Sequence, residues 1–174
     1  MTIRTATTDD IPAIVKLLNS AYRGVSSRAG WTTEADLIGG EVRTSETDVQ
    51  MVMTRQGSRF LLLCDETGGI KGCVNLQLQA AAVYLGMFAV QPGIQGQGLG
   101  RMLLTASENW TLESGRERIV MWVISVRTEL IAWYQRLGFR DTGERKEFKE
   151  DGLSGPHLRP LEFMILEKAI AAVR

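Results

Sequence analysis

A glycine-rich turn between a strand-like and a helix-like segment most constrains how this chain can fold. An apolar run ends at Val90, and glycines then alternate at positions 96, 98 and 100. Over residues 99–112, apolar side chains recur at helical spacing on one face. The free amides at a helix N-terminus attract anions, and glycines let an anion approach the backbone. The turn therefore predicts a phosphate or diphosphate site.

Two common phosphate-binding motifs do not fit this turn. A P-loop carries Lys and then Ser or Thr after its glycines, and no such pair follows Gly100. A Rossmann fingerprint counted from Gly96 requires a glycine at its sixth position, which here is Arg101. The remaining alternative to an anion site is a turn that only reverses the chain.

Periodicity elsewhere predicts one α/β domain over residues 1–174. Strict alternation over 74–79 predicts a strand with one buried face, and the apolar run 118–124 predicts a strand in the centre of a sheet. The expected order is strand, two helices, three strands, helix, strand, helix, two strands. The other expected strands are 2–6, 59–64, 80–90, 144–149 and 161–168, and the other helices begin at Thr8 or Asp9, at a capping box over 47–50, and at Thr128, with a short helix from Thr32 or Thr33.

Composition argues against several other classes of protein. The 174 residues are 44% hydrophobic and carry 20 basic against 20 acidic side chains, which disfavours disorder and nucleic-acid binding. The longest nearly apolar stretch, 80–90, is too short to span a bilayer, and no signal segment opens the chain. We therefore expect a cytoplasmic protein without a membrane partner. One histidine and two isolated cysteines, Cys64 and Cys73, predict no metal site and two buried thiols.

Two sequence blocks resemble motifs of the GNAT superfamily of acyl-CoA-dependent N-acyltransferases. Residues 95–100 fit its Gln/Arg-x-x-Gly-x-Gly/Ala motif, and 134–139 resemble its Tyr-x-x-x-Gly-Phe helix end. The blocks stand in the family's order, and the predicted elements match the family along nearly the whole chain. The resemblance implies an α+β (mixed α/β) GNAT-like fold. Its central mixed, mostly antiparallel sheet has about seven strands and is flanked by about four helices.

The resemblance also implies a site for acetyl-CoA as co-substrate. The amides of the 95–100 turn would hold the CoA diphosphate. The strand before the turn would splay from strand 118–124, so that pantetheine pairs with its backbone. A main-chain amide near Phe88 would donate to the thioester carbonyl. The expected cofactor-binding residues are Phe88, Ala89, Val90, Gln95, Gly96, Gln97, Gly98, Leu99, Gly100 and Arg101, the last of which is equally typical of a solvated helix face.

Tyr134 is the expected catalytic residue on the same resemblance. A positioned phenol can protonate the departing CoA thiolate as a general acid. The alternative is that Tyr134 only packs with Leu130 and Leu137 on the buried face of its helix.

The general base stays open. Some family members carry a glutamate twelve residues before the tyrosine, and this position is Trp122 here. Glu34, Glu41 and Glu162 are unranked candidates, each with a surface carboxylate as the alternative. Arg127 stands where many members have asparagine.

The acceptor side is expected between residues 22 and 47. Arginines and aromatic residues there could hold an amine that carries a carboxylate, and the alternative is a polar loop anchored by one tryptophan. His157 is expected to be a loop histidine. The residues of interest in the segment are Tyr22, Arg23, Arg28, Trp31, Glu34, Glu41 and Arg43.

Together these features predict an enzyme that transfers an acetyl group from acetyl-CoA directly to a primary amine of a small molecule. Direct transfer is expected because neither cysteine lies in the exposed, electropositive setting of a nucleophile. The alternatives are a protein or peptide acceptor on the same fold, and a CoA-binding regulatory module without turnover. A homodimer is a possible assembly, and no nucleic-acid partner is expected.

Overall fold

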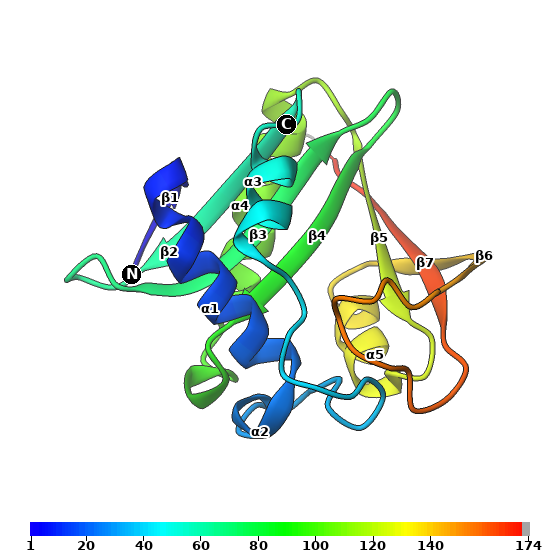
Figure 1. The fold of residues 1–174 in the computed structure, drawn as a ribbon. Coiled ribbons are helices and arrows are strands. Elements are labelled where there is room, and N and C mark those ends of the chain that lie inside the picture. The colour runs from blue at the N-terminus through cyan, green and yellow to red at the C-terminus, as the bar shows by residue number, and fades with distance from the viewer. Residues whose placement is uncertain (172–174) are drawn as a thin grey trace.

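A single seven-stranded sheet organises the computed structural model, which describes residues 1–171 (Figure 1). Its strand order is β1-β2-β3-β4-β5-β7-β6, and every neighbouring pair is antiparallel except β4 and β5. The predicted domain, 1–174, extends three residues beyond the described part. The strands are β1 (Thr2–Thr5), β2 (Ser58–Cys64), β3 (Ile70–Leu78), β4 (Val83–Val90), β5 (Arg118–Ile124), β6 (Arg140–Glu147) and β7 (Glu162–Ala169).

Helices cover both faces of the sheet. The α-helices are α1 (Ile11–Tyr22), α2 (Gly24–Ser27), α3 (Glu46–Met53), α4 (Leu99–Glu113) and α5 (Thr128–Arg136), and the 3-10 turns are η1 (Thr8–Asp10) and η2 (Pro92–Ile94). Apolar side chains of α1 and α3 form one buried cluster, and those of α4 and α5 form another on the opposite face. The predicted mixed fold is confirmed, with the single-turn α2 as a fifth helix. No helix within residues 1–171 is long and apolar enough to cross a membrane.

The covering of both faces corrects one prediction. Alternation over 74–79 predicted a strand with one solvated face, but Asn75 is only 3% exposed. The Asn75 Nδ2 donates to Ser58 Oγ at 2.9 Å, which satisfies the buried amide. In β2, Leu61 and Leu63 pack on the α4 side while Phe60 packs on the α1 side. The alternation of apolar and polar residues over 74–79 therefore belongs to a strand that is covered on both faces.

Three helix predictions near the N-terminus are wrong in detail. The first turn is capped by Thr7 through a capping box with Asp10, not by Thr8 or Asp9. The second capping box joins Ser45 and Asp48, two residues before the predicted start. No helix begins at Thr32 or Thr33, because this segment is held by long-range contacts such as the bond from Arg127 Nη2 to the Thr32 hydroxyl at 2.7 Å.

β4 and β5 separate soon after they begin, as the family resemblance implied. They pair only at Val83–Ile119 and Tyr84–Val120, whereas β5 pairs with β7 along its whole length. In Figure 1 the two strands diverge toward the end that carries α5. β4 also has a bulge opposite β3, where Met87 has a φ of 46°. A bulge leaves one residue of the strand without a ladder partner. On the other edge of β4, pairing with β5 ends at Tyr84, so the backbone groups of later β4 residues that face β5 have no strand partner.

Candidate active site

Two cavities meet where β4 and β5 separate. The first has a volume of about 280 Å³ and the second about 430 Å³. Tyr22, Phe88, Arg127, Leu130 and Tyr134 line both. The first lies against the glycine-rich turn and the second against β5, β7 and the segment 148–154. The junction between them is therefore the place where two bound molecules would come into contact.

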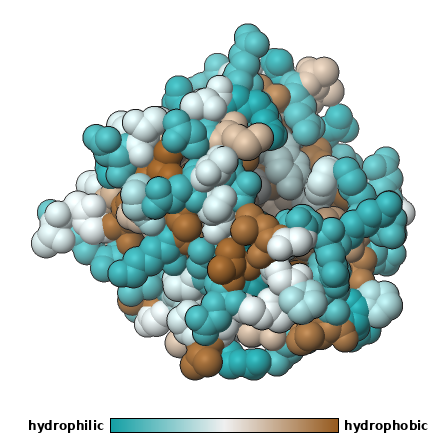
Figure 2. Space-filling view, in the orientation of Figure 1, coloured by the Kyte–Doolittle hydropathy of each residue, from teal (hydrophilic) through white to brown (hydrophobic). Residues whose placement is uncertain are grey.

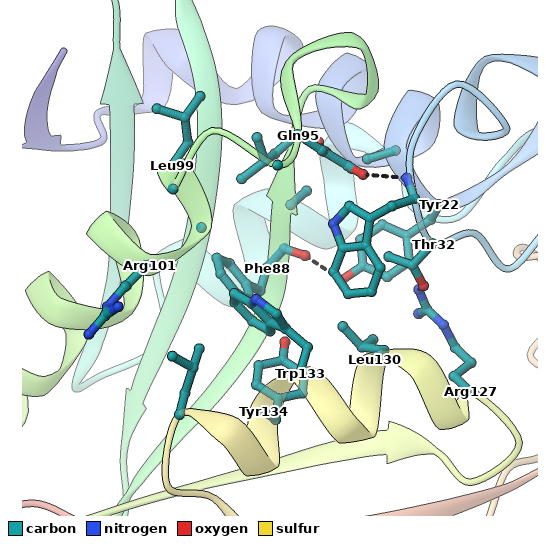
Figure 3. Close-up of a pocket in the computed structure, with 18 residues that line it drawn as sticks. Tyr22, Thr32, Phe88, Gln95, Leu99, Arg101, Arg127, Leu130, Trp133 and Tyr134 are labelled. Carbon is teal, nitrogen blue, oxygen red and sulfur yellow. Dashed lines mark hydrogen bonds between the residues drawn. The ribbon is translucent and has the colours of Figure 1, made fainter.

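The first cavity contains nearly all of the residues predicted to bind the cofactor. Phe88 to Val90, Gln95, Gly96 and Gly98 to Arg101 line it, and Gln97 does not (Figure 3). Arg101 is exposed, and in Figure 3 its side chain points away from the other labelled residues. The lining residues not predicted for this cavity are Ala21, Tyr22, Trp31, Thr32, Arg127, Leu130, Trp133 and Leu137.

The glycine turn leaves the start of α4 open to a ligand. Gly98 is the N-cap residue of α4, with a φ of 80° and no side chain capping the helix. That conformation suits glycine and strains other residues. A Cβ at Gly98 would have no heavy atom within 4 Å, so the space above it is empty. The first amides of α4 are thus uncapped by side chains and face the cavity, as an anion site requires.

Aromatic side chains form the wall between turn and junction. The Trp133 ring centroid lies 6.2 Å from that of Phe88 and 5.0 Å from that of Tyr134. Trp31 lies 6.1 Å from Trp133 on the outer side. A Cβ at Gly100 would lie 3.4 Å from the Trp133 ring, so the glycine lets α4 approach this wall. The first cavity is a narrow, mostly apolar slot that ends in a polar turn.

Gln95 connects the two sides of the first cavity rather than pointing at a ligand. Its Oε1 accepts from the Trp31 amide at 3.0 Å, and its Nε2 donates to the Val90 carbonyl at 3.0 Å (Figure 3). The side chain therefore ties the 28–33 segment to the end of β4.

Tyr134 lies at the junction of the cavities. Its ring is 5% exposed and packs against Phe139 at 5.5 Å between centroids. Its hydroxyl makes no hydrogen bond to any of residues 1–171, although the residue lines both cavities. Burial raises the pKa of Tyr134 well above the ordinary phenol value, so the hydroxyl remains a proton donor at neutral pH. The residue thus packs in the core and also presents an unused hydroxyl at the junction.

A buried hydrogen bond fixes the backbone at the same point. The Tyr22 hydroxyl donates to the Phe88 carbonyl oxygen at 2.6 Å, joining the end of α1 to the bulged part of β4 (Figure 3). Because the carbonyl of Phe88 is held by Tyr22 and its ladder partner is displaced by the bulge, the backbone orientation here is set by tertiary contacts.

The second cavity is lined by residues from eight separate parts of the chain, which are 22–23, 34, 43–48, 84–88, 121–124, 127–134, 148–154 and 163. Figure 2, in the orientation of Figure 1, shows the surface hollowed near the middle of this face, with hydrophobic (brown) side chains nearby. Trp122 stands at the position where some members of the resembled family carry a glutamate. Its ring lies 5.2 Å from that of Tyr84 and 5.9 Å from that of Phe163 between centroids, and these three rings form an aromatic wall of the second cavity. The charged lining residues are Arg23, Glu34, Arg43, Asp48, Arg127 and Asp151.

A buried ionic cluster borders the second cavity, and one of its members, Arg127, lines both cavities. Glu34 is 6% exposed, and its two carboxylate oxygens accept from Arg23 and, at 2.9 Å, from Arg127. Arg127 also donates to the Thr32 hydroxyl. Both oxygens of Glu34 are therefore committed to guanidinium groups, so it is not a free base. Sequence analysis flagged Arg127 only as a departure from asparagine, and no local pattern signalled that it would meet a residue 93 positions earlier.

The other candidate bases lie outside the cavities. Glu41 lines neither, and Glu162 lines neither and is more than half exposed. His157 lies in the loop before β7, as expected, and its ring packs edge to face against Phe148, 4.6 Å between centroids. Arg28, a predicted acceptor residue, forms an exposed ion pair with Asp36 at 2.7 Å. Within residues 1–171 no three His, Cys, Asp or Glu side chains are grouped so as to hold a metal ion.

A strand that separates from its parallel neighbour, an uncapped helix start and an unpaired tyrosine at the junction are the features of an acyl-CoA-dependent acyltransferase site. The sequence model of the acetyltransferase (GNAT) domain matches residues 41–158, more than half of the chain. The protein therefore belongs to the GNAT acetyltransferase family.

Individual relatives agree with this assignment. Mycothiol acetyltransferase of Renibacterium salmoninarum is 32% identical over 107 residues, which cover 55% of this chain and 31% of that protein. The chain thus spans about a third of the length of this curated relative. The ribosomal-protein-S18-alanine N-acetyltransferase of Escherichia coli superposes with a TM-score of 0.73 at 19% identity, covering 99% of this chain and 96% of that one.

A phosphinothricin acetyltransferase of Sinorhizobium meliloti, solved in complex with acetyl-CoA, superposes with a TM-score of 0.69 at 18% identity. The match covers 98% of this chain and 88% of that one. At these identities the structural likeness establishes the shared fold.

Proposed function

We propose that the protein transfers an acetyl group from acetyl-CoA directly to a primary amine of a small molecule, with Tyr134 as general acid. The observation that carries this proposal is the hydroxyl of Tyr134, which has no protein partner among residues 1–171 and lies where the two cavities meet. A tyrosine with only a packing role would not need its hydroxyl at this junction.

Acetyl-CoA is the proposed occupant of the first cavity. The uncapped amides at the start of α4 suit its diphosphate, and the apolar slot between Phe88 and Trp133 suits pantetheine. The part of β4 beyond Tyr84 has no partner on the β5 side, so pantetheine amides can pair with it as an added strand. The family neighbour solved with acetyl-CoA supports the same assignment.

The chemistry follows from the junction. The neutral amine attacks the thioester carbonyl, a C–N bond forms, and a backbone amide at the bulge near Phe88 stabilises the developing oxyanion. Collapse breaks the C–S bond, and the CoA sulfur takes its proton from the Tyr134 hydroxyl. The amine loses one proton, and the tyrosine is reprotonated, so the net products are the N-acetyl amide and CoA with a free thiol. No side-chain base is assigned, because each carboxylate in the second cavity is already hydrogen-bonded.

Direct transfer is supported by the state of the two thiols. Cys64 and Cys73 are free and buried, and burial raises the pKa of Cys73 to about 12. A thiol that stays protonated and inaccessible is a poor nucleophile. Neither cysteine lines either cavity. An acyl-enzyme on cysteine therefore has no support in this site.

A small acceptor is favoured by the wall of the second cavity. The loop that follows its lining residue Ser154 is joined to the loop that follows its lining residue Glu34: the Gly39 amide donates to the Pro156 carbonyl at 2.8 Å, and the Leu158 amide donates to the Leu37 carbonyl at 2.8 Å. Arg23 Nε adds a longer bond to the Ser154 carbonyl, at 3.4 Å. An extended peptide would have to displace these contacts.

Calorimetric titration with acetyl-CoA, CoA and ATP tests the cofactor assignment first. We expect acetyl-CoA and CoA to bind and ATP not to compete at similar concentration. Gly98→Trp should lower acetyl-CoA affinity at least about 100-fold, because the indole fills the space above the turn and strains a φ of 80°. Gly93→Trp is the matched control, since Gly93 has open space and no positive φ and lines neither cavity.

A thiol-release assay with a panel of primary amines then tests turnover. Folded protein that binds acetyl-CoA but acetylates no amine would support the regulatory module instead. Loss of binding in both glycine variants would remove the assignment of the diphosphate to this turn.

A further inference from the structure

One charged side chain in the second cavity has no polar partner among residues 1–171. Six charged residues line this cavity, and five of them hydrogen-bond through their charged groups. The exception is Arg43, whose guanidinium makes no hydrogen bond or ion pair to any of residues 1–171. A guanidinium offers five N–H donors, and none of these is matched here.

Each acid of the cavity already accepts hydrogen bonds from protein donors, through both oxygens in Glu34 and through one oxygen in Asp48 and in Asp151. Glu34 is shared between Arg23 and Arg127. Asp48 Oδ2 accepts from the Ser45 amide at 3.1 Å and from its hydroxyl at 2.8 Å. Asp151 Oδ1 accepts from the amide and the hydroxyl of Ser154, each at 2.8 Å. Every acid of the cavity therefore serves at least one protein donor, whereas the guanidinium of Arg43 serves no acceptor among residues 1–171.

Arg43 is held in place although it has no polar partner. Its Cζ lies 4.2 Å from the ring centroid of Tyr22, a cation–π distance that leaves the guanidinium edge free. Its backbone amide donates to Asn19 Oδ1 at 2.7 Å, and the Thr44 amide donates to the same oxygen at 3.0 Å. The capping box of α3 begins at the next residue, Ser45. The donor is therefore pre-organised, which lowers the entropic cost of binding a ligand.

A second unmatched group lies beside Arg43. Thr44 lines the same cavity and is 3% exposed, and its buried hydroxyl has no hydrogen-bond partner. Buried hydroxyls are nearly always hydrogen-bonded, so an unpaired one in the residue that follows Arg43, lining the same cavity, calls for a missing acceptor. Arg43 and Thr44 together would provide the donors for one small anion.

The position of Arg43 relates this anion to the reacting atoms. Arg43 stacks on Tyr22, and the hydroxyl of that same ring touches the Phe88 carbonyl at the bulge of β4. The ring of Tyr22 would therefore lie between an anion bound by Arg43 and the bulge of β4, where acetyl transfer is proposed. This spacing suits a compact acceptor with its amine and its anion close together.

We propose that Arg43 is the specificity-determining residue of the acceptor site and that the acceptor is an amine bearing a carboxylate, of the size of a free amino acid. This proposal rests on the proposed function and names its acceptor class. A single guanidinium with one hydroxyl matches a monoanionic carboxylate, which arginine binds through two parallel hydrogen bonds. The aromatic wall of Tyr84, Trp122 and Phe163 would receive the remainder of the acceptor.

The test measures binding separately from turnover. Protein saturated with CoA is titrated by calorimetry with L-phenylalanine, L-leucine, L-serine and L-glutamate, and with the α-carboxamide of each. We expect at least one acid to bind about 10- to 100-fold more tightly than its amide, the range for a charge-assisted hydrogen bond. Arg43→Gln should abolish this preference while leaving CoA affinity unchanged, since Arg43 does not line the first cavity.

The matched control is Arg55→Gln. Arg55 is an exposed arginine just after α3, outside both cavities, and should keep the full preference for the acid. The proposal is overturned if every amide binds as tightly as its acid, if no acid binds although CoA does, or if Arg43→Gln retains the preference. An acid preference that depends on Arg43 but is followed by no acetylation would uphold this site and refute the proposed function.

Discussion

The two cavities are built in different ways, and the difference explains why one was readable from the sequence. The proposed cofactor cavity draws its predicted residues from one run, 88–101, and offers backbone groups at a bulge and a helix start. The proposed acceptor cavity draws its charged groups from Arg23 just after α1, Glu34, the 43–48 segment, Arg127 just before α5 and the loop at 151–154. Backbone recognition leaves a local glycine pattern, whereas side-chain recognition assembled from distant segments leaves none.

The electrostatics of the cavities differ as well. The first is mostly apolar apart from its turn, while the second is bordered by the buried cluster of Arg23, Glu34 and Arg127. Tyr134 belongs to both. The cavities can therefore be perturbed separately at their own residues and jointly at Tyr134.

The largest expected effect is at the shared residue. Tyr134→Phe should lower kcat by about 10²–10⁴-fold, the usual range for a lost general acid, with little change in acetyl-CoA affinity. Because burial raises the pKa of Tyr134, its ionisation should cause no fall of kcat between pH 7 and its ordinary value of 10. Steady-state kinetics across that pH range, paired with calorimetry, is the measurement.

If Tyr134→Phe keeps the parental kcat, Tyr134 is a packing residue only. If kcat and acetyl-CoA affinity fall by the same factor, the substitution has instead disturbed the packing of Phe88 and Trp133 against Tyr134 in the first cavity.

The second largest effect is expected at Glu34, which lines the second cavity and not the first. Glu34→Gln should cost about 3–5 kcal/mol of unfolding free energy, because it leaves two buried guanidinium groups without a counter-charge. The KM for the amine should rise more than the KM for acetyl-CoA. Denaturant unfolding followed by Trp fluorescence measures the first quantity, and initial rates measure the second.

The control for this variant is Glu162→Gln, which alters a carboxylate more than half exposed and paired only at 3.9 Å. It should change stability by no more than about 0.5 kcal/mol. Equal destabilisation by the two substitutions would contradict the organising role of Glu34.

A smaller effect tests the connection between the cavities. Gln95→Ala removes the hydrogen bonds to the Trp31 amide and the Val90 carbonyl, at a cost of about 1–3 kcal/mol. The Trp31 amide should exchange its hydrogen faster, and acetyl-CoA should bind more weakly. Hydrogen exchange and calorimetry on one preparation report both changes.

Gln91→Ala is the matched control for Gln95→Ala. Gln91 is exposed at the start of the same turn, and its side chain makes no hydrogen bond within residues 1–171. Faster exchange at Trp31 in this variant too would show that the turn is loosened in general and that Gln95 has no special connecting role.

Several elements were predictable because their signals are local. The apolar run of β5 and the helix ending before Gly138, whose φ is 94°, matched the structure closely. β6 was misplaced by four residues, because Arg140–Glu147 is polar and largely exposed and offers no apolar periodicity. The segment 23–45 was misread for a related reason, since its conformation depends on partners such as Asn19, Ser154 and Arg127.

The sequence by itself determined the order of the seven strands and the four longer helices and the family, and it predicted the cofactor turn and Tyr134 as the candidate acid. Only the tertiary structure decided that Glu34 is occupied, that Arg127 joins the cavities, and that Arg43 is left without a partner. The physical reason is the distance along the sequence over which each interaction acts. Periodicity, glycine conformation and helix capping depend on residues a few positions apart, whereas ion pairing and desolvation depend on which distant segments the fold brings into contact.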